Sequence, residues 1–231
     1  MFTGIVTALG TIREARQTGD LRAVIACPFD PAGIAMGASI ACSGVCLTVV
    51  EKGGIAGDAW FAVDISGETV ARTVPGRWVE GMRLNLEPAL KLGDELGGHI
   101  VTGHVDGVGE VVGVCPEGDS RRIGFAVSHD LAPYLAPKGS ITVDGVSLTV
   151  NDVADQPDGS CHFSVNLIPH TSEVTTLGAL EQGSKVNLEI DVLARYLQRM
   201  QSLRGRSTRP AQPERDRAPN GPFASPSRVI A

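Results

Sequence analysis

The sequence contains the same unit twice, and this duplication limits the possible folds more than any other feature of the 231-residue chain. Thr3–Val6 recurs as Thr102–Val105 with one substitution, and Ser39–Val49 recurs in modified form as Ser140–Val150. The offset drifts only from 99 to 102 residues through the later matched pairs Phe61/Phe163, Thr69/Thr171, Gly81/Gly183, Asn85/Asn187 and Glu87/Glu189. Such self-similarity identifies a repeated structural unit. We therefore expect two similar domains, residues 1–97 and 98–190.

Short alternating or β-branched runs predict six strands in each unit. The expected strands are Ile5–Ile12, Ala23–Ala26, Ser39–Cys42, Val45–Val50, Trp60–Ile65 and Arg83–Glu87, then Val101–Val114, Arg122–Val127, Ser140–Val143, Val146–Val153, Cys161–Leu167 and Lys185–Ile190. Ser43-Gly44 and Asp144-Gly145 are expected at the tips of two-residue hairpins, whose positive φ values glycine tolerates. Barrel closure removes the open edges of such short strands. The sequence thus predicts a mainly β protein of two tandem six-stranded Greek-key β-barrels related by internal duplication.

The segment after the second unit predicts a short C-terminal α-helix over residues 191–204. Asp191 is expected to cap it, Gly205 to end it, and an apolar stripe recurs at 3-4-3 spacing in Leu193, Tyr196, Met200 and Leu203. Because the stripe lies outside both units, a contact between subunits is favoured over packing on the chain's own barrels. Residues 205–231, rich in Pro and Arg, are expected to form a disordered tail.

Charge and composition exclude several classes of protein. Residues 202–231 hold six Arg and two acids, a charge of +4, which leaves −10 on the rest of a chain whose total is −6. Such an acidic body argues against nucleic-acid binding, and no apolar run approaches the roughly 18 residues of a membrane span. The N-terminus lacks a positively charged signal region, and five cysteines without a CxxC pair fit a reduced, cytoplasmic protein. His99 and His104 are five residues apart, a spacing that argues against a shared metal ion, so no metal is expected.

Differences between matched positions point to the residues that carry chemistry. Cys46 corresponds to Ser147, and Ile5 corresponds to His104. Each hairpin is expected to form one wall of a ligand pocket, with main-chain atoms of Gly4–Val6 or Gly103–Val105 as further partners. The alternative is structural: an isolated strand cysteine is more often a small core residue, and a hairpin serine is often simply hydrogen-bonded. A Ser-His-acid hydrolase is disfavoured because the G-x-S-x-G motif is missing.

Six segments carry a specific resemblance when taken together and in order. They are MFTGIV, GASIACSGVCLTV, GGHIVTGHVDG, DGVSLTV, NLIPHTSEVTTLG and VNLEID. Over residues 1–203 the chain resembles the riboflavin synthase family. The resemblance implies a transferase that needs no cofactor and dismutates two molecules of 6,7-dimethyl-8-ribityllumazine into riboflavin and 5-amino-6-ribitylaminouracil. It also implies a homotrimer, in which the C-terminal helix is the trimerisation element.

The resemblance also assigns site residues. Those expected to be catalytic are Cys46, Ser39, Ser147, His104 and Asp191, with His99 as an indirect partner. Those expected to contact substrate are Gly4, Ile5, Val6, Cys46, Leu47, Thr48, Asp64, Ile65, Ser66, Gly103, His104, Val105, Lys138, Ser147, Leu148, Thr149, Ile168, Pro169, His170, Thr171, Ser172 and Glu173.

Two other functions stay open at the level of sequence. The first is a non-catalytic lumazine- or flavin-binding protein of the same fold, although such a binder needs no proton-transfer residues. The second is a pair of nucleic-acid-binding barrels, which the acidic body and the scarcity of aromatic residues disfavour.

Overall fold

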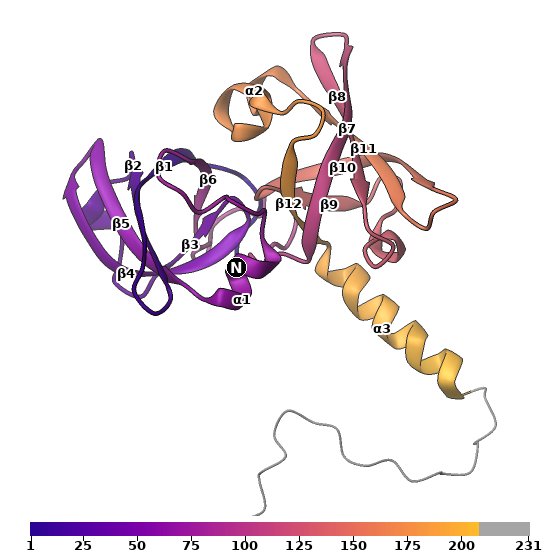
Figure 1. The fold of residues 1–231 in the computed structure, drawn as a ribbon, viewed down its shortest axis with the longest axis horizontal. Helices are drawn as coiled ribbons and strands as arrows, with labels where there is room; N and C mark the ends of the chain where they lie inside the picture. Colours follow the sequence, from indigo (N-terminus) through magenta and orange to yellow (C-terminus); the bar gives the residue numbers. More distant parts are fainter. Residues whose placement is uncertain (208–231) are drawn as a thin grey trace, which may run out of the picture.

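The computed structural model describes residues 1–207, which form two closed antiparallel barrels followed by a helix (Figure 1). The first barrel contains β1 (Ala8–Gln17), β2 (Leu21–Cys27), β3 (Ser39–Cys42), β4 (Val45–Ile55), β5 (Asp58–Ile65) and β6 (Arg83–Pro88). The second contains β7 (Gly107–Glu117), β8 (Ser120–Val127), β9 (Ser140–Val143), β10 (Val146–Asp155), β11 (Cys161–Leu167) and β12 (Lys185–Ile190). The predicted six-stranded barrels are confirmed.

Both barrels connect their strands in the same order. The closed sequences are β1-β2-β5-β4-β3-β6 and, in matched positions, β7-β8-β11-β10-β9-β12. β3, β4 and β5 form an antiparallel meander, and β2, which precedes them in the chain, lies beside β5, the last of the three. This strand order is the Greek-key arrangement. The helical elements are η1 (Pro31–Gly33), α1 (Gly67–Arg72), η2 (Ala132–Tyr134), α2 (Pro169–Val174), η3 (Thr176–Ala179) and α3 (Val192–Ser207). Because α1 and α2 lie at matched positions, the duplication extends beyond the strands.

Each barrel has its own apolar core. Inward-facing residues such as Ile25 and Phe61 in the first barrel, and Phe125 and Phe163 in the second, are fully buried. Their alternation with outward-facing residues produces the period of two that predicted the strands. A barrel whose strands supply Val, Ile and Leu to the interior needs few aromatic residues to fill it.

The two predicted hairpin turns are confirmed, and their tips touch each other. Ser43 and Gly44 have φ values of 45° and 82°, and Asp144 and Gly145 have 44° and 81°, as a type I′ turn requires. A Cβ atom on Gly44 would lie 2.9 Å from the amide nitrogen of Gly145, and one on Gly145 would lie 2.7 Å from that of Gly44. Glycine is therefore required here both by the turn and by the contact between barrels.

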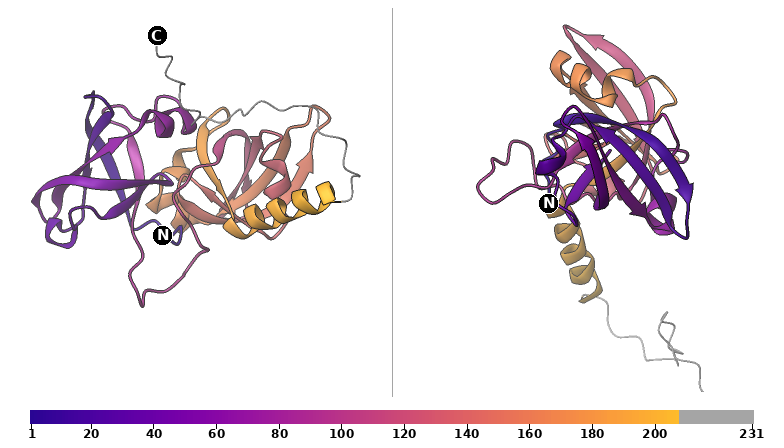
Figure 2. Two further views of the ribbon diagram at one scale, coloured as in Figure 1. Left: turned by 90° about the horizontal axis from the view of Figure 1, so that it is seen from below. Right: turned by 90° about the vertical axis from the view of Figure 1, so that its left-hand side faces the viewer.

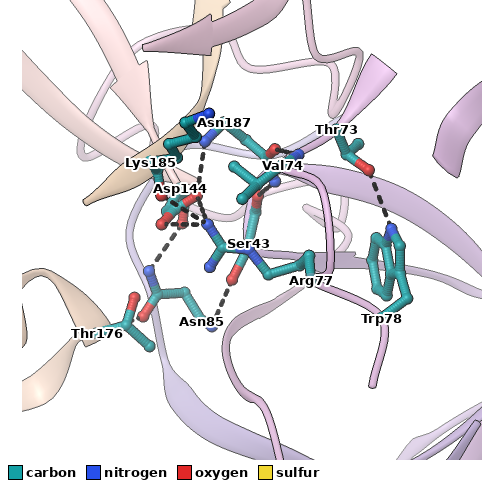
Figure 3. A network of polar contacts seen from close by, with 10 residues as sticks. All are labelled: Ser43, Thr73, Val74, Arg77, Trp78, Asn85, Asp144, Thr176, Lys185 and Asn187. Carbon is teal, nitrogen blue, oxygen red and sulfur yellow. Dashed lines mark hydrogen bonds and ion pairs between the residues drawn. The ribbon is translucent and has the colours of Figure 1, made fainter. Parts of the chain in front are cut away.

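Matched asparagines lock the barrels together around these tips (Figure 3). Asn85 Nδ2 donates to the Asp144 carbonyl at 2.8 Å, and Asn187 Nδ2 donates to the Ser43 carbonyl at 2.9 Å. The same two side chains accept bonds from main-chain amides of the opposite unit. One contact breaks the symmetry, because Asp144, unlike its counterpart Ser43, forms a buried ion pair with Arg77 at 2.9 Å.

Two expected strand starts are wrong. The strands expected from Ile5 and Val101 begin only at Ala8 and Gly107. In the preceding segments, backbone amides of Thr3–Gly4 and Thr102–His104 donate to Glu87 and Glu189 instead of to a neighbouring strand. These segments have strand-like sequences, but their backbone amides bond to glutamate side chains.

The helix α3 projects from the second barrel, as Figure 1 and the right-hand view of Figure 2 show. Asp191 caps it as predicted, since its Oδ1 accepts a bond of 2.9 Å from the Leu193 amide. The expected end at Gly205 is wrong, because the helix continues to Ser207; an interior glycine weakens a helix without ending it. Most of the expected tail, residues 208–231, lies outside the described part of the chain. None of the helices within residues 1–207 has the length and apolarity needed to cross a membrane.

Candidate functional site

The two units cross each other at two matched places. The N-terminal segment of each unit lies on the hairpin of the other: Cys46 N donates to the Gly103 carbonyl, and Ser147 N donates to the Gly4 carbonyl, both at 2.8 Å. The start of the chain thus lies between the barrels (Figure 1). Each crossing consequently brings residues from both copies of the repeat together.

Glycine is required at both crossing points. Gly103 has a φ of 79°, and a Cβ atom there would lie 2.5 Å from Cys46 Cβ. Gly4 has a φ of 76°, and its Cβ atom would lie 2.6 Å from Ser147 Cβ. Any side chain at either position would push the reactive hairpin away, since real Cβ contacts are never this short.

Two buried glutamates hold the crossing segments. Glu189 accepts bonds from the amides of Thr102, Gly103 and His104, and Glu87 accepts bonds from those of Thr3 and Gly4. Burial raises the pKa of Glu87, and its bonds to Thr3 and Gly4 oppose the rise. The positions of both crossing segments therefore depend on carboxylates that accept hydrogen bonds from the main chain.

The first pocket, the Cys46 pocket, is a cavity of about 580 Å³. Its lining residues are Val45, Cys46, Glu68, Thr69, Arg72, Thr73, Gly103, His104, Val105 and Asp106. Cys46 from β4 and the exposed His104 from the second unit are brought together here, whereas the nearby Cys42 is fully buried and burial raises its thiol pKa. Cys46 is half-buried: it packs partly on the cluster of Phe2, Ala41 and Val101 and also lines the cavity.

The second crossing, where the sequence predicts the other pocket (the Ser147 pocket), contains the other histidine. His99 Nδ1 lies 2.7 Å from Ser147 Oγ, and His99 Nε2 lies 3.1 Å from Thr142 Oγ1. Burial lowers the pKa of His99, an effect that the charge of Asp191 opposes. A neutral imidazole donates at one nitrogen and accepts at the other, so it can exchange a proton with the Ser147 hydroxyl. The two histidines thus lie in different pockets, and no group of three or more potential metal ligands occurs within residues 1–207.

The lowered pKa of His99 predicts a pH dependence of stability. The folded protein resists protonation of this ring, while the unfolded chain takes up a proton near the ordinary value of 6.5. The contribution of His99 to the free energy of unfolding is therefore present above 6.5 and is lost as the pH falls through the folded pKa. Urea unfolding at a series of pH values should show a steeper loss in the wild type than in His99→Gln. The exposed His129 provides the control variant His129→Gln, and equal slopes for wild type and His99→Gln would contradict the burial of a neutral ring.

Several expected site residues are not among the lining residues of the Cys46 pocket and have other partners. The side chains of Leu47 and Ile65 are buried in the first barrel core. Asp64 pairs with Arg22 at 3.5 Å, and Ser66 caps α1 by accepting a bond from the Thr69 amide at 3.2 Å. Lys138 donates its amide to the Val150 carbonyl with a φ of 68°.

Other expected residues lie around the hairpins. Ser39 stands opposite Thr48 in the β3–β4 ladder, as Ser140 stands opposite Thr149 in the β9–β10 ladder. Leu148 packs partly on the second core, and Ile5 and Val6 follow Gly4 across the Ser147 hairpin. The residues Ile168, Pro169, His170, Thr171, Ser172 and Glu173 form or flank α2, the counterpart of the helix that lines the Cys46 pocket.

The sequence reasoning missed five polar residues of the Cys46 pocket. They are Glu68, Thr69 and Arg72 of α1, Thr73 at its C-terminal end, and Asp106, which follows the segment that carries His104. The duplication contained the signal for two of them, because their counterparts His170 and Thr171 were expected in the second pocket. Glu68 and Thr69 could therefore have been predicted from their matched positions in the second copy.

Comparisons with known proteins agree with this architecture. A family model described as the lumazine binding domain matches residues 3–89 and again residues 102–191. Riboflavin synthase of Brucella abortus (strain 2308) is 48% identical over 206 residues, which cover 87% of this chain and 98% of that protein. Riboflavin synthase of Mycobacterium tuberculosis (strain ATCC 25618 / H37Rv) is 44% identical over 207 residues, covering 89% and 100%.

Solved structures of LumP share the fold. The complex with riboflavin has a TM-score of 0.68 and 27% sequence identity, and it covers 82% of this chain and 99% of LumP. The complex with 6,7-dimethyl-8-(1'-D-ribityl) lumazine has a TM-score of 0.66 at the same identity and coverage. With two matched domains and relatives of nearly the same length, the chain belongs to the riboflavin synthase family and carries two lumazine-binding domains.

Proposed function

We propose that this protein is a transferase that dismutates two molecules of 6,7-dimethyl-8-ribityllumazine. A four-carbon unit passes from one lumazine to the other, giving one riboflavin and one 5-amino-6-ribitylaminouracil, so that all atoms are accounted for. The observation that carries the proposal is the pair of crossed sites, a cavity lined by Cys46 and His104 and a hairpin where His99 bonds to Ser147. Two similar pockets suit a reaction whose two substrates are the same molecule.

The residues of the pockets match the chemical needs of this reaction. The acidic C7 methyl group of one lumazine must lose a proton, and C7 of the other must accept a nucleophile. His104 lines the same cavity as Cys46, which supports a role in moving a proton, and the Ser147 hydroxyl has an imidazole partner in His99. Asp191 acts on His99 through its charge, and its second task is to cap α3. These groups need no metal ion or cofactor to transfer protons.

We further propose a homotrimer, in which the Cys46 pocket of one subunit faces the Ser147 pocket of its neighbour. The support is the apolar face of α3, where Leu193, Tyr196, Leu197, Met200 and Leu203 each expose between 48 and 65% of their surface. These side chains are not covered by the chain's own barrels, and large exposed apolar faces mark contacts with other subunits. The expected location is the cytoplasm, where biosynthetic lumazine would be available, and no nucleic-acid or membrane partner is expected.

The decisive experiment is an absorbance assay for riboflavin, with purified protein and 6,7-dimethyl-8-ribityllumazine as the sole substrate. We expect riboflavin and the uracil product in equal amounts, at half the amount of lumazine consumed. The competing function is the non-catalytic binder, a role that the LumP complexes illustrate at the level of fold. Tight binding of lumazine, seen as a change in its fluorescence, without riboflavin formation would refute the enzyme and favour the binder.

A further inference from the structure

An ion pair joins α3 to the segment that carries His104. Arg195 Nη1 lies 2.8 Å from Asp106 Oδ1, and Arg195 Nη2 donates to Asp106 Oδ2 at 2.9 Å. Two parallel bonds between a guanidinium and a carboxylate fix orientation as well as distance. The Asp106 side chain is only 13% exposed and lines the Cys46 pocket together with His104.

The rest of the segment is held by β12, the strand that leads into α3. Glu189 accepts the amides of Thr102, Gly103 and His104, and Asp106 N donates to the Leu188 carbonyl at 2.8 Å. Ile190 N donates to Asp106 Oδ2 at 2.9 Å. The main chain around His104 is therefore fixed by β12, and α3 reaches the same segment through the ion pair of Arg195 with Asp106.

The first copy of the repeat lacks this arrangement. Thr7 stands where the second copy has Asp106, and its hydroxyl bonds to the Leu86 carbonyl. Pro88 stands in place of Ile190 and has no amide hydrogen to donate. A helix follows only the second unit. Asp106, the Ile190 amide and Arg195 therefore occur together only in the unit that precedes α3.

We propose that Asp106 and Arg195 are positioning residues that couple the seating of α3 in the assembly to the placement of His104 in the Cys46 pocket. This inference rests on the proposed function and on the exposed apolar face of α3 as an assembly surface. When other subunits cover this face, α3 is held in one position. The ion pair with Arg195 then holds the Asp106 carboxylate, two residues from His104, in place. A helix left uncovered holds Asp106 less firmly, and the pocket loses its alignment.

The test measures assembly and turnover of the full-length chain carrying Arg195→Ala. We expect a particle of wild-type mass, a fall in kcat of about tenfold or more, and a change in KM below about threefold, because sub-ångström misplacement affects the reacting geometry more than binding. Arg195→Lys should give an intermediate kcat, since an ammonium cannot form the bidentate contact. Arg199→Ala is the matched control, because Arg199 is exposed on the same helix and should keep wild-type turnover.

A second variant, Asp106→Asn, keeps the shape of the side chain and leaves α3 intact. We expect a similar fall in kcat, and the double variant should lose little more than either single one, since both remove the same contact. If the Arg195→Ala protein dissociates into single chains, the kcat of the Asp106→Asn protein alone tests the coupling. Wild-type kcat in an assembled Asp106→Asn protein, or losses that simply multiply in the double variant, would overturn the coupling. Failure of the wild type to form riboflavin would instead overturn the proposed function.

Discussion

Replacing His104 by alanine should lower turnover far more than lumazine affinity. His104 lies in the Cys46 pocket with its backbone amide fixed by Glu189, so the substitution removes the imidazole and leaves the walls in place. Loss of a positioned proton-transfer group costs on the order of 10² to 10⁴ in kcat. Steady-state formation of riboflavin gives kcat, and fluorescence titration with lumazine gives the dissociation constant separately.

The control for this substitution is His129→Ala. His129 lines a separate cavity with Pro133 and Asp155 on the second barrel, away from Cys46 and His104, and should leave both kcat and affinity unchanged. Comparable losses of kcat and affinity in His104→Ala would show that the imidazole binds substrate instead of moving a proton. Unchanged kcat would remove His104 from the mechanism altogether.

Placing charges on the apolar face of α3 should separate the assembly into single chains and abolish turnover. The variant Leu193→Glu/Met200→Glu changes two exposed residues and keeps Asp191 and Arg195, so the caps and the ion pair within the subunit remain possible. Buried unpaired carboxylates are incompatible with a subunit contact. If each reaction site needs pockets from two subunits, kcat should fall by at least about 10², because the second substrate is no longer held in place.

Mass measurement in solution by light scattering checks this result, with 24.1 kDa expected for the separated chain. The control is a chain that ends at Ser207, which keeps all of α3 and should keep both assembly and turnover. Two outcomes contradict the proposal: an unchanged mass would mean that α3 is not the assembly surface, and fully active single chains would mean that one chain contains a complete reaction site.

The strands were predictable because their signal is local. Ser39–Cys42, Cys161–Leu167 and Lys185–Ile190 have the expected bounds, since short runs of mostly buried residues are typical of strands in a closed barrel. The hairpins at Ser43-Gly44 and Asp144-Gly145 were equally predictable from the positive φ that they require. Residues 5–7 and 101–106 were wrongly assigned to strands, because nothing local shows that these segments continue from amides that bond to Glu87 of β6 and Glu189 of β12.

The composition of the pockets could be predicted only in part. Cys46, His104 and Ser147 differ between matched positions, and this marked them as candidates before any contact was known. The bond between His99 and Ser147 and the ion pair between Asp106 and Arg195 join residues 48 and 89 positions apart. Neither spacing follows a strand or helix period, so no pattern could reveal them.

The sequence by itself determined that the chain folds as two similar barrels and belongs to one family, because turns, alternation and repeated motifs are encoded within each unit. Only the tertiary structure decided that Gly103 lies on Cys46 and Gly4 on Ser147. In a duplicated sequence, the same residue types can make a contact within one unit or a contact between the two units. The choice between them depends on how the barrels are rotated against each other, and this is set by the hydrogen bonds of Asn85 and Asn187 and the contact of Gly44 with Gly145.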